Sequence, residues 1–435
     1  MDPDAVRFVE FDAVLLALDD RSNLHPVSET VPLPAMPLGN VPLVVFPLYQ
    51  IAQAGFESCI VVVSQSAHAA VSAALRHVMD DIPMKIRVEH VPNNIGSAEA
   101  LRKVRGYIDH DFLLVDTDII CTMPLLELAD LHRTRVAGAT VLLHRMQLPD
   151  GESARQRRTA LAADMTRHYV AMDGDRLVYL RLAADIESDQ TFSLGPSILQ
   201  QAGGSLTVQT RIQTTGIAIL AHWVLDVLDA KKGITDVYRE LIPYLVQKQF
   251  ARPFPFDDLL GDQSDIQLAR TMSYMFEPDS DPINGCYALV MPDQYYCTRI
   301  NSLPAYARAN LVLCSASQAH WALVHRGNRA DDPAHAHAKI SKSLIAANVH
   351  IGEGAVLRDS VIGPGCSVGP NAVVTRSVLL DGAHVAASCC VESSVIGQQS
   401  RLQEQSSVAN STIGSSYTIE ADLVIKDDIL FNEAA

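Results

Sequence analysis

The stretch that decides the fold of the C-terminal part is Ile351-Gly-Glu-Gly-Ala-Val-Leu-Arg-Asp-Ser-Val-Ile-Gly-Pro-Gly-Cys-Ser-Val368. It is one turn of a gapless 17-residue repeat, in which an aliphatic residue returns at three positions separated by five, six and six residues. The three columns are Ile340, Leu357, Val374, Val391, Val408 and Ile425; then Ile345, Ile362, Leu379, Ile396, Ile413 and Leu430; and then Ile351, Val368, Val385, Leu402 and Ile419. A fixed period of this length indicates a solenoid of stacked coils.

Three aliphatic columns per turn predict a triangular, left-handed parallel β-helix of the hexapeptide-repeat kind. Such solenoids also occur in acyltransferases, which usually place a catalytic His beside a looped-out coil. The repeat is uninterrupted here, and its histidines, His350 and His384, stand just before inward column positions. We therefore expect both histidines at corners or on the surface, and we do not favour acyl transfer.

The first half of the chain alternates strand and helix patterns. Buried strands are expected at 14–18, 59–64, 85–91, 111–115 and 138–146, and helices at 43–54, 67–79, 97–107 and 124–135. This order predicts a Rossmann-like α/β domain with a mostly parallel sheet and right-handed crossovers. Sites in such sheets lie at the carboxyl ends of strands. We place the α/β domain at 1–255, a connecting segment at 256–338 and the β-helix at 339–435.

Composition limits the function classes. A chain of 435 residues with 48% hydrophobic residues supports two or three folded domains. No run of 18 apolar residues predicts a membrane span, and the N-terminus has no secretory pattern. Eight scattered cysteines suit reduced thiols in the cytosol. A net charge of −16 argues against direct nucleic-acid binding.

The first predicted strand leads into a proline-rich loop with Pro26, Pro32, Pro34 and Pro37. The loop resembles that of the sugar-1-phosphate nucleotidylyltransferases, Gly-Gly-x-Gly-Thr-Arg-Leu-x-Pro-Leu-Thr followed by Pro-Lys-Pro. The residues that would handle phosphate differ, because the three glycines are matched by Leu18, Asp19 and Arg21, the Arg by Asn23 and the Lys by Leu33. An ordinary strand–loop connection is the alternative interpretation.

These replacements argue against phosphoryl chemistry. Glycines let a loop turn its N–H groups onto phosphate, and β-carbons obstruct that approach. Removal of one charge-stabilising donor typically costs about a hundred- to thousand-fold in rate, roughly 3–4 kcal/mol. We therefore expect no catalytic residues here and treat Asn23 and Leu33 as degenerate positions.

Two later loops keep residues similar to that family. Gly96-Ser97-Ala98 resembles its Gly-Thr-Ala loop, which contacts the nucleotide base or ribose, and Asp118 matches an Asp that holds magnesium. The alternatives are that Ser97 caps a helix and that Asp118 is a strand-end turn residue. One carboxylate is a poor magnesium site, and the stretch where a second is expected, residues 213–217, contains no acid. The resemblance implies at most a vestigial nucleotide pocket, with no metal and no cofactor.

A nucleotidylyltransferase-like domain followed by a left-handed β-helix is similar to active sugar pyrophosphorylases and to the gamma and epsilon subunits of translation initiation factor 2B. Two stretches resemble the gamma subunits in particular. They are Glu240-Leu-Ile-Pro-Tyr-Leu-Val-Gln-Lys-Gln-Phe250 and Cys297-Thr-Arg-Ile-Asn-Ser-Leu-Pro-Ala-Tyr-Ala-Arg-Ala-Asn310. We expect no helical-repeat domain of the epsilon type after the solenoid.

The resemblance implies a non-catalytic, cytosolic subunit of a guanine nucleotide exchange complex. Its partners would be an epsilon-type subunit, the alpha, beta and delta subunits, and initiation factor 2 bound to GDP. Two alternatives stay open. One is a working sugar-1-phosphate nucleotidylyltransferase that uses mannose-1-phosphate or glucose-1-phosphate. The other is a regulatory pseudoenzyme that binds a nucleotide or sugar nucleotide as a ligand.

Overall fold

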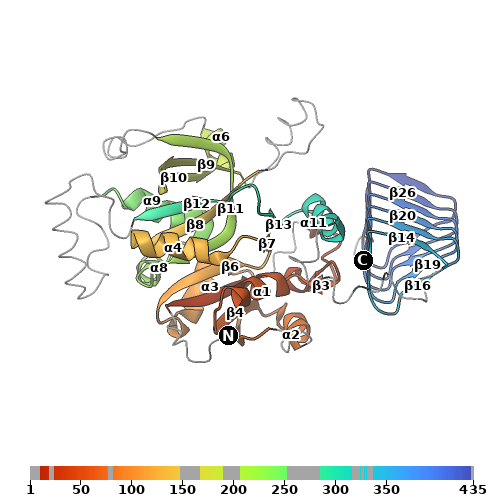
Figure 1. Cartoon of the computed structure of the whole chain (residues 1–435), viewed down its shortest axis with the longest axis horizontal. Helices are drawn as coiled ribbons and strands as arrows, with labels where there is room; N and C mark the ends of the chain where they lie inside the picture. Colours follow the sequence, from red (N-terminus) through yellow and green to blue (C-terminus); the bar gives the residue numbers. More distant parts are fainter. Residues whose placement is uncertain are drawn as a thin grey trace. The chain divides into compact units, whose positions relative to one another are not determined.

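The chain divides into two compact units, each assembled from separate stretches of sequence (Figure 1). The first unit contains residues 1–17, 47–65 and 81–297, and the second contains residues 18–46, 66–80 and 298–435. The computed structural model describes residues 10–18, 24–76, 82–146, 167–189, 206–251, 285–315, 324, 328, 330 and 337–432. No helix in these ranges is both long and apolar enough to cross a membrane.

The first unit is built on a nine-stranded sheet in the order β5-β4-β1-β6-β11-β8-β12-β10-β9. The strands are β1 (Phe11–Ala17), β4 (Ser58–Ser64), β5 (Lys85–Val91), β6 (Asp111–Asp116), β8 (Ala139–Arg145), β9 (His168–Asp173), β10 (Arg176–Leu182), β11 (Thr207–Leu220) and β12 (Cys286–Val290). β10 and β11 run antiparallel to the other strands of this sheet. The predicted α/β class is confirmed, with two reversed strands in a mostly parallel sheet.

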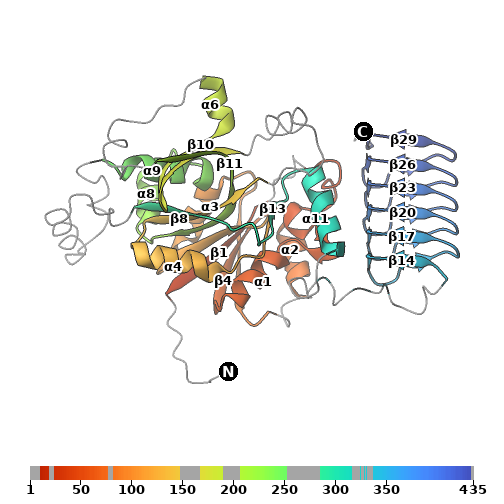
Figure 2. The ribbon, with the colours of Figure 1, turned by 45° about the horizontal axis from the view of Figure 1, so that its top comes forward.

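Helices flank this sheet (Figures 1 and 2). They include α1 (Val45–Gln53), α3 (Ser97–Val104), α4 (Leu125–Arg135), α6 (Ala183–Asp189), α8 (Val224–Ala230) and α9 (Ile242–Lys248). A short 3₁₀ turn, η4 (Arg105–Tyr107), follows α3, so the helical pattern ends at the predicted residue. The apolar residues whose spacing predicted the helix at 43–54, such as Val45, Leu48 and Ile51, are buried in α1. The sequence did not predict α6 or α8.

One predicted boundary is corrected by the sheet. Residues 286–290, which the sequence placed in a connecting segment, form β12 between β8 and β10. Cys286, Tyr287 and Ala288 are 1–2% exposed, because a strand at this position is covered on both faces. The sheet domain therefore reaches beyond residue 255, and the other domain limits stay a prediction.

In the second unit, residues 339–430 form a triangular prism of parallel strands (Figure 2). The first face holds β14 (Lys339–Ser341), β17 (Val356–Arg358), β20 (Val373–Thr375), β23 (Cys390–Glu392), β26 (Ser407–Ala409) and β29 (Val424–Lys426). The second face holds β15 (Leu344–Ile345), β18 (Val361–Ile362), β21 (Val378–Leu379), β24 (Val395–Ile396), β27 (Thr412–Ile413) and β30 (Ile429–Leu430). The third face holds β16 (His350–Ile351), β19 (Ser367–Val368), β22 (His384–Val385), β25 (Arg401–Leu402) and β28 (Thr418–Ile419).

The strand register of the prism follows the 17-residue repeat of the sequence. Leu357 lies beside Val374, and Val374 lies beside Val391, each pair separated by 17 residues. The three aliphatic columns form one buried core cluster, which confirms the predicted β-helix. His350 and His384 are exposed on the third face, as expected.

Every corner of the prism turns through a left-handed residue. The corners between the first and second faces use Lys342, Asp359, Arg376, Ser393, Asn410 and Asp427, all with φ between 48° and 54°. Side chains other than glycine adopt this region at an energetic cost. The stacking of coils must therefore compensate for this cost at each turn.

A ladder of buried serines lies beside that corner. The ladder consists of Ser343, Ser360, Ser377, Ser394 and Ser411. The hydroxyl of Ser377 donates to the carbonyl of Thr375 at 2.7 Å and accepts from the N–H of Ser394 at 3.2 Å. The same pattern repeats along the ladder, so each hydroxyl satisfies a corner N–H of the next coil.

Replacement of a ladder serine should destabilise the solenoid. In Ser377→Ala, the buried N–H of Ser394 loses its acceptor, which costs about 1–3 kcal/mol. Denaturant unfolding of the full chain measures this loss. Ser407→Ala, at a half-exposed position of β26, is the matched control and should change stability by less than about 0.5 kcal/mol. Equal losses of unfolding free energy in the two variants would contradict the stabilising role of the ladder serines.

Candidate functional site

The proline-rich loop belongs to the second unit. Its described part, residues 24–46, contains η2 (Leu33–Ala35), β2 (Pro37–Leu38) and β3 (Val41–Pro42). Leu33, at the position of the family's Lys, is 7% exposed and is therefore a core residue. Asn23 lies outside the described residues. The sequence from Leu24 to Phe46 contains no Lys or Arg, so this stretch supplies no side-chain cation for a polyphosphate.

The loop is bound along one edge of the solenoid. Asn40 donates its side-chain N–H to the carbonyl of Ile362 at 3.1 Å. Thr30 donates its hydroxyl to the side-chain carbonyl of Gln398 at 3.1 Å, and the hydroxyl of Ser415 lies 3.4 Å from that of Thr30. Ile362 and Ser415 lie 53 positions apart in the chain, about three turns of the repeat, so the loop follows the solenoid lengthwise.

The start of this loop reaches the last coil. The ring of His25 packs edge-on against Phe431, with centroids 4.7 Å apart. A β-carbon at Gly414 would lie 2.9 Å from Phe431 and 3.2 Å from Pro26. Gly414 is therefore required by the close approach of these two side chains.

The end of the loop is fixed by α11 (Leu303–Ser315). The N–H of Gly39 donates to Asn310 at 2.9 Å in a buried hydrogen bond, and the Tyr306 hydroxyl donates to the carbonyl of Pro37. Burial raises the pKa of Tyr306 and keeps this hydroxyl protonated as a donor. Gly39 has φ +55°, and a β-carbon there would lie 2.8 Å from Val324. The N–H of Gly39 and the carbonyl of Pro37 are thus already hydrogen-bonded within the protein.

The Gly96-Ser97-Ala98 loop is bound to another segment of the first unit. A β-carbon at Gly96 would lie 2.0 Å from the carbonyl oxygen of Thr235. That oxygen accepts the N–H of Ala98 at 3.0 Å, and the Ser97 hydroxyl accepts the N–H of Val237 at 2.8 Å. Gly96 is thus needed for packing against Thr235. It also occupies the cap position of α3, so the alternative of Ser97 as the cap is wrong.

Sequence reasoning missed the partner of this loop. Glu240 accepts the N–H of Thr235 at 2.6 Å, and this hydrogen bond lowers the pKa of the Glu240 carboxyl. Asp236 accepts the N–H of Arg239 at 2.7 Å and caps the following helical turn. The signal in the sequence is Asp236, an acid directly before an apolar stretch, which is a preferred N-cap residue. It fixes the carbonyl of Thr235 against α3.

Asp118 lies in the turn between β6 and β7 (Ile119–Cys121), at the carboxyl edge of the sheet. Its neighbour Thr117 donates both its N–H, at 3.1 Å, and its hydroxyl, at 2.6 Å, to the carbonyl of Leu16. These two bonds join the ends of β6 and β1. The structure thus places Asp118 half-buried at the edge where the α/β fold predicts a site.

The candidate stretch for a second carboxylate, residues 213–217, contains a glycine that faces Asp116. β11 pairs with β6 so that Gly216, at φ +80°, lies against Asp116. A β-carbon at Gly216 would be 2.9 Å from the Asp116 carboxylate. Among the described residues, no three His, Cys, Asp or Glu side chains gather as metal ligands. Residues 213–217 thus bring a glycine, and no acid, next to Asp116.

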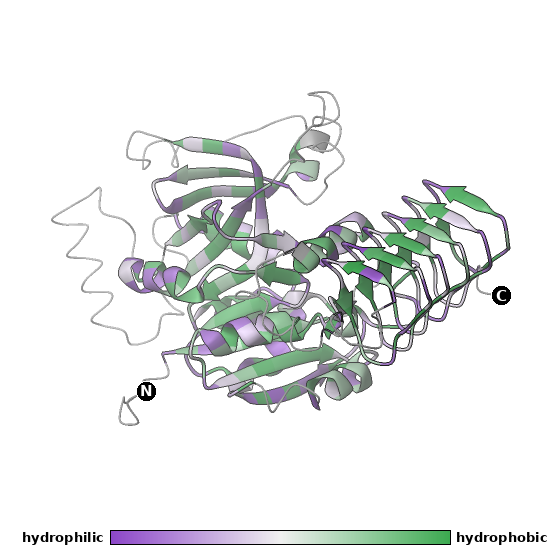
Figure 3. Cartoon of the chain, turned by 45° about the vertical axis from the view of Figure 1, so that its right-hand side comes forward, coloured by the Kyte–Doolittle hydropathy of each residue, from purple (hydrophilic) through white to green (hydrophobic). Residues whose placement is uncertain are grey.

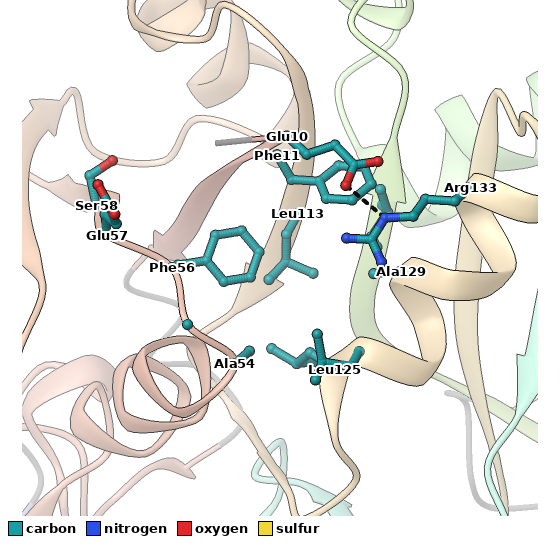
Figure 4. Close-up of a pocket in the computed structure, with 13 residues that line it drawn as sticks. Glu10, Phe11, Ala54, Phe56, Glu57, Ser58, Leu113, Leu125, Ala129 and Arg133 are labelled. Atoms are coloured by element: carbon teal, nitrogen blue, oxygen red, sulfur yellow. Dashed lines mark hydrogen bonds and ion pairs between the residues drawn. The ribbon is translucent and has the colours of Figure 1, made fainter. Parts of the chain in front are cut away.

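A small apolar pocket lies elsewhere in the first unit (Figure 4). Its volume is about 110 Å³, below the roughly 300–1,000 Å³ of typical ligand pockets. It lies near the amino ends of β1 and β4, and its lining includes Phe11, Phe56, Leu113, Leu125 and Ala129. It contains none of the predicted site residues and is too small for a nucleotide.

Comparison with known proteins agrees with this architecture. Residues 13–151 match the Nucleotidyl transferase family model, and residues 338–434 match the model described as GMPPB C-terminal domain. The chain is 29% identical to translation initiation factor eIF2B subunit gamma of Schizosaccharomyces pombe, over 69% of this chain and 65% of that protein. It is 26% identical to the subunit of that name from Dictyostelium discoideum, over 69% of this chain and 74% of that protein.

Similarity to enzymes is confined to a shorter stretch. Mannose-1-phosphate guanyltransferase of Aspergillus oryzae is 26% identical over 140 residues, which cover 32% of this chain and 38% of the enzyme. The expected resemblance to the gamma subunits is confirmed, and a nucleotidyl transferase domain is present. The chain spans just under two thirds of the length of the Schizosaccharomyces pombe relative.

The addition of one methyl group at Gly96 tests its contact with Thr235. In Gly96→Ala, the new β-carbon overlaps the carbonyl of Thr235, and we expect a loss of about 1–3 kcal/mol in unfolding free energy. Gly233→Ala is the control, because no atom lies within 4 Å of the β-carbon position there. Thermal and denaturant unfolding measure both variants. A Gly96→Ala protein as stable as the control would contradict the required close approach.

Asp381, at a corner of the solenoid, should make stability depend on pH. Burial raises the pKa of its carboxyl, so the folded state binds the proton more tightly than the unfolded state. Its contribution is most favourable below the unfolded pKa and is lost as pH rises through the folded pKa. Asp381→Asn should therefore be more stable than wild type at pH 7, with a smaller difference near pH 4. Urea unfolding across this range tests the sign, and a difference independent of pH would contradict it.

Proposed function

We propose that this chain is a gamma-type, non-catalytic subunit of the guanine nucleotide exchange complex for translation initiation factor 2. In this role, it pairs with an epsilon-type subunit and supports the release of GDP from the factor. The observation that carries the proposal is the similarity to two eIF2B gamma subunits over 69% of the chain. The proline-rich loop supports the non-catalytic part of the proposal.

The physical argument starts at Leu33. A nucleotidyl transfer site needs donors aimed at the phosphates, and a buried Leu provides none. The backbone N–H of Gly39 is already used by Asn310. Loss of one phosphate donor alone costs about 3–4 kcal/mol of transition-state stabilisation. We infer that phosphoryl chemistry has been lost while the proline framework is retained for packing.

The proposed role is that of a rigid scaffold. The solenoid holds its shape through the stacked aliphatic columns and the serine ladder. Such repetitive surfaces suit assembly with other subunits. We propose the alpha, beta, delta and epsilon subunits and initiation factor 2 as partners, in the cytosol. Gly96, Ser97, Ala98 and Asp118 then mark a vestigial nucleotide pocket that requires no cofactor.

A second candidate is a sugar-1-phosphate nucleotidylyltransferase. The match of residues 13–151 to the Nucleotidyl transferase model and the partial similarity to guanyltransferases favour it. Asp118, at the carboxyl edge of β6, would be its magnesium ligand. A pseudoenzyme that senses a nucleotide sugar would use the same residues, without turnover.

Two assays on the purified full chain separate these functions. With mannose-1-phosphate or glucose-1-phosphate, each NTP and magnesium, we expect pyrophosphate release at least about a hundred-fold below that of an active guanyltransferase assayed in parallel. Added to an epsilon-type subunit, the chain should accelerate GDP release from initiation factor 2. Robust pyrophosphate release would overturn the proposal in favour of the enzyme, whereas calorimetric binding of GDP-mannose without turnover would favour the sensor.

A further inference from the structure

The last coil of the solenoid exposes apolar side chains that the earlier coils do not. Eight large hydrophobic residues are prominently exposed in the described part of the chain, and four of them lie within residues 423–431. These four are Leu423, Val424, Ile429 and Phe431, with exposed fractions of 45%, 62%, 50% and 38%. Val424 lies in β29 on the first face and Ile429 in β30 on the second, so these residues surround the last coil. Their concentration in one coil marks a candidate interaction site.

On the second face, apolar side chains that point outwards are buried by other parts of the chain. Leu344, Val361, Val378 and Val395 point away from the solenoid core, yet they are at most 3% exposed. α11 packs against β18 on this face. The next position of this outer column is Thr412, and Ile429 follows it in the last coil, where it is exposed. Figure 3 shows that hydrophobic strands continue along the solenoid to this end. The outer column of the second face therefore changes from buried apolar residues in the earlier coils to an exposed apolar residue in the last coil.

The strands of this coil are the outermost strands of the sheets that the structure describes. Within the described residues, β28, β29 and β30 each pair with a strand of the preceding coil on one side only. Proteins commonly protect such edges with charged residues. Charged turns are present here, but Val424 and Ile429, in the edge strands themselves, are apolar and at least half exposed. Protection of the edge alone does not account for them.

Charge identifies the kind of partner. Residues 420–432 contain four acidic residues, Glu420, Asp422, Asp427 and Asp428, and one base, Lys426, all exposed. Two copies of this acidic coil placed face to face would repel each other, and the net charge of −16 increases that repulsion. A basic surface would be attracted to it instead. The pattern therefore favours a different protein over a second copy of the chain.

We propose that the coil formed by residues 420–432 is a docking face for a protein partner that presents an apolar patch rimmed by lysine and arginine. The apolar side chains supply the buried centre of the contact, and the acidic turns supply a polar rim that steers the encounter. The identity of the partner rests on the proposed function, under which it is another subunit of the exchange complex.

The test uses the full chain co-expressed with the other subunits. In Val424→Lys/Ile429→Lys, both changes lie at exposed positions, and the new cations repel a basic partner. We expect at least a tenfold weaker assembly by native mass spectrometry and sedimentation, with an unchanged melting temperature. Val208→Lys, at a position 45% exposed in the first unit, is the matched control and should assemble as the wild type does.

A second pair of changes tests the rim. Asp427→Lys/Asp428→Lys should weaken assembly and reduce its dependence on salt, because the attraction between acidic and basic groups is screened by ions. If the wild type assembles and both double variants assemble equally well, the docking face is wrong and the proposed function stands. If the wild type itself fails to assemble with these subunits, the proposed function and the docking face are both overturned.

Discussion

The second unit depends on the contact between the proline-rich loop and the solenoid. A β-helix has three outer faces, and an apolar outer column such as Leu344 and Val361 needs a cover. Here α11 packs on that face, and the loop runs beside it along a solenoid edge, joined by the hydrogen bonds of Asn40 and Thr30. Hydrogen bonds of this kind contribute about 0.5–1.5 kcal/mol each, so several are needed to hold a loop in place.

This contact and phosphate binding place opposite demands on one loop. A loop that wraps phosphate must turn its N–H groups towards the ligand. In this chain, the N–H of Gly39 is turned towards Asn310, and Leu33 is buried in the core. Prolines serve both purposes, because they restrict the backbone before any partner binds. The proline spacing is therefore compatible with the packing of this loop, in which Leu33 occupies a buried position.

The solenoid could be predicted well from the sequence, because the pattern that specifies each coil is local and is repeated in every coil. Each coil has the same register, so Leu357, Val374 and Val391 report one geometry several times. The parallel strands at the start of the first unit were also predicted, since their apolar runs are continuous. β12 was missed because its five residues lie far along the chain from their neighbours in the sheet. Pairing over such separations leaves no periodic trace in a single sequence.

The candidate site was predictable only as a set of positions. Gly96 and Ser97 were identified by resemblance, but their contacts with Thr235 and Val237 are non-local and depend on how the segment around Glu240 folds. The resemblance indicated residues 213–217 only as a candidate stretch without an acid, and β11 brings Gly216 of this stretch next to Asp116. A glycine there cannot be distinguished from an ordinary strand residue until the pairing is known. Close packing against Asp116 then explains why a side chain is excluded from that position.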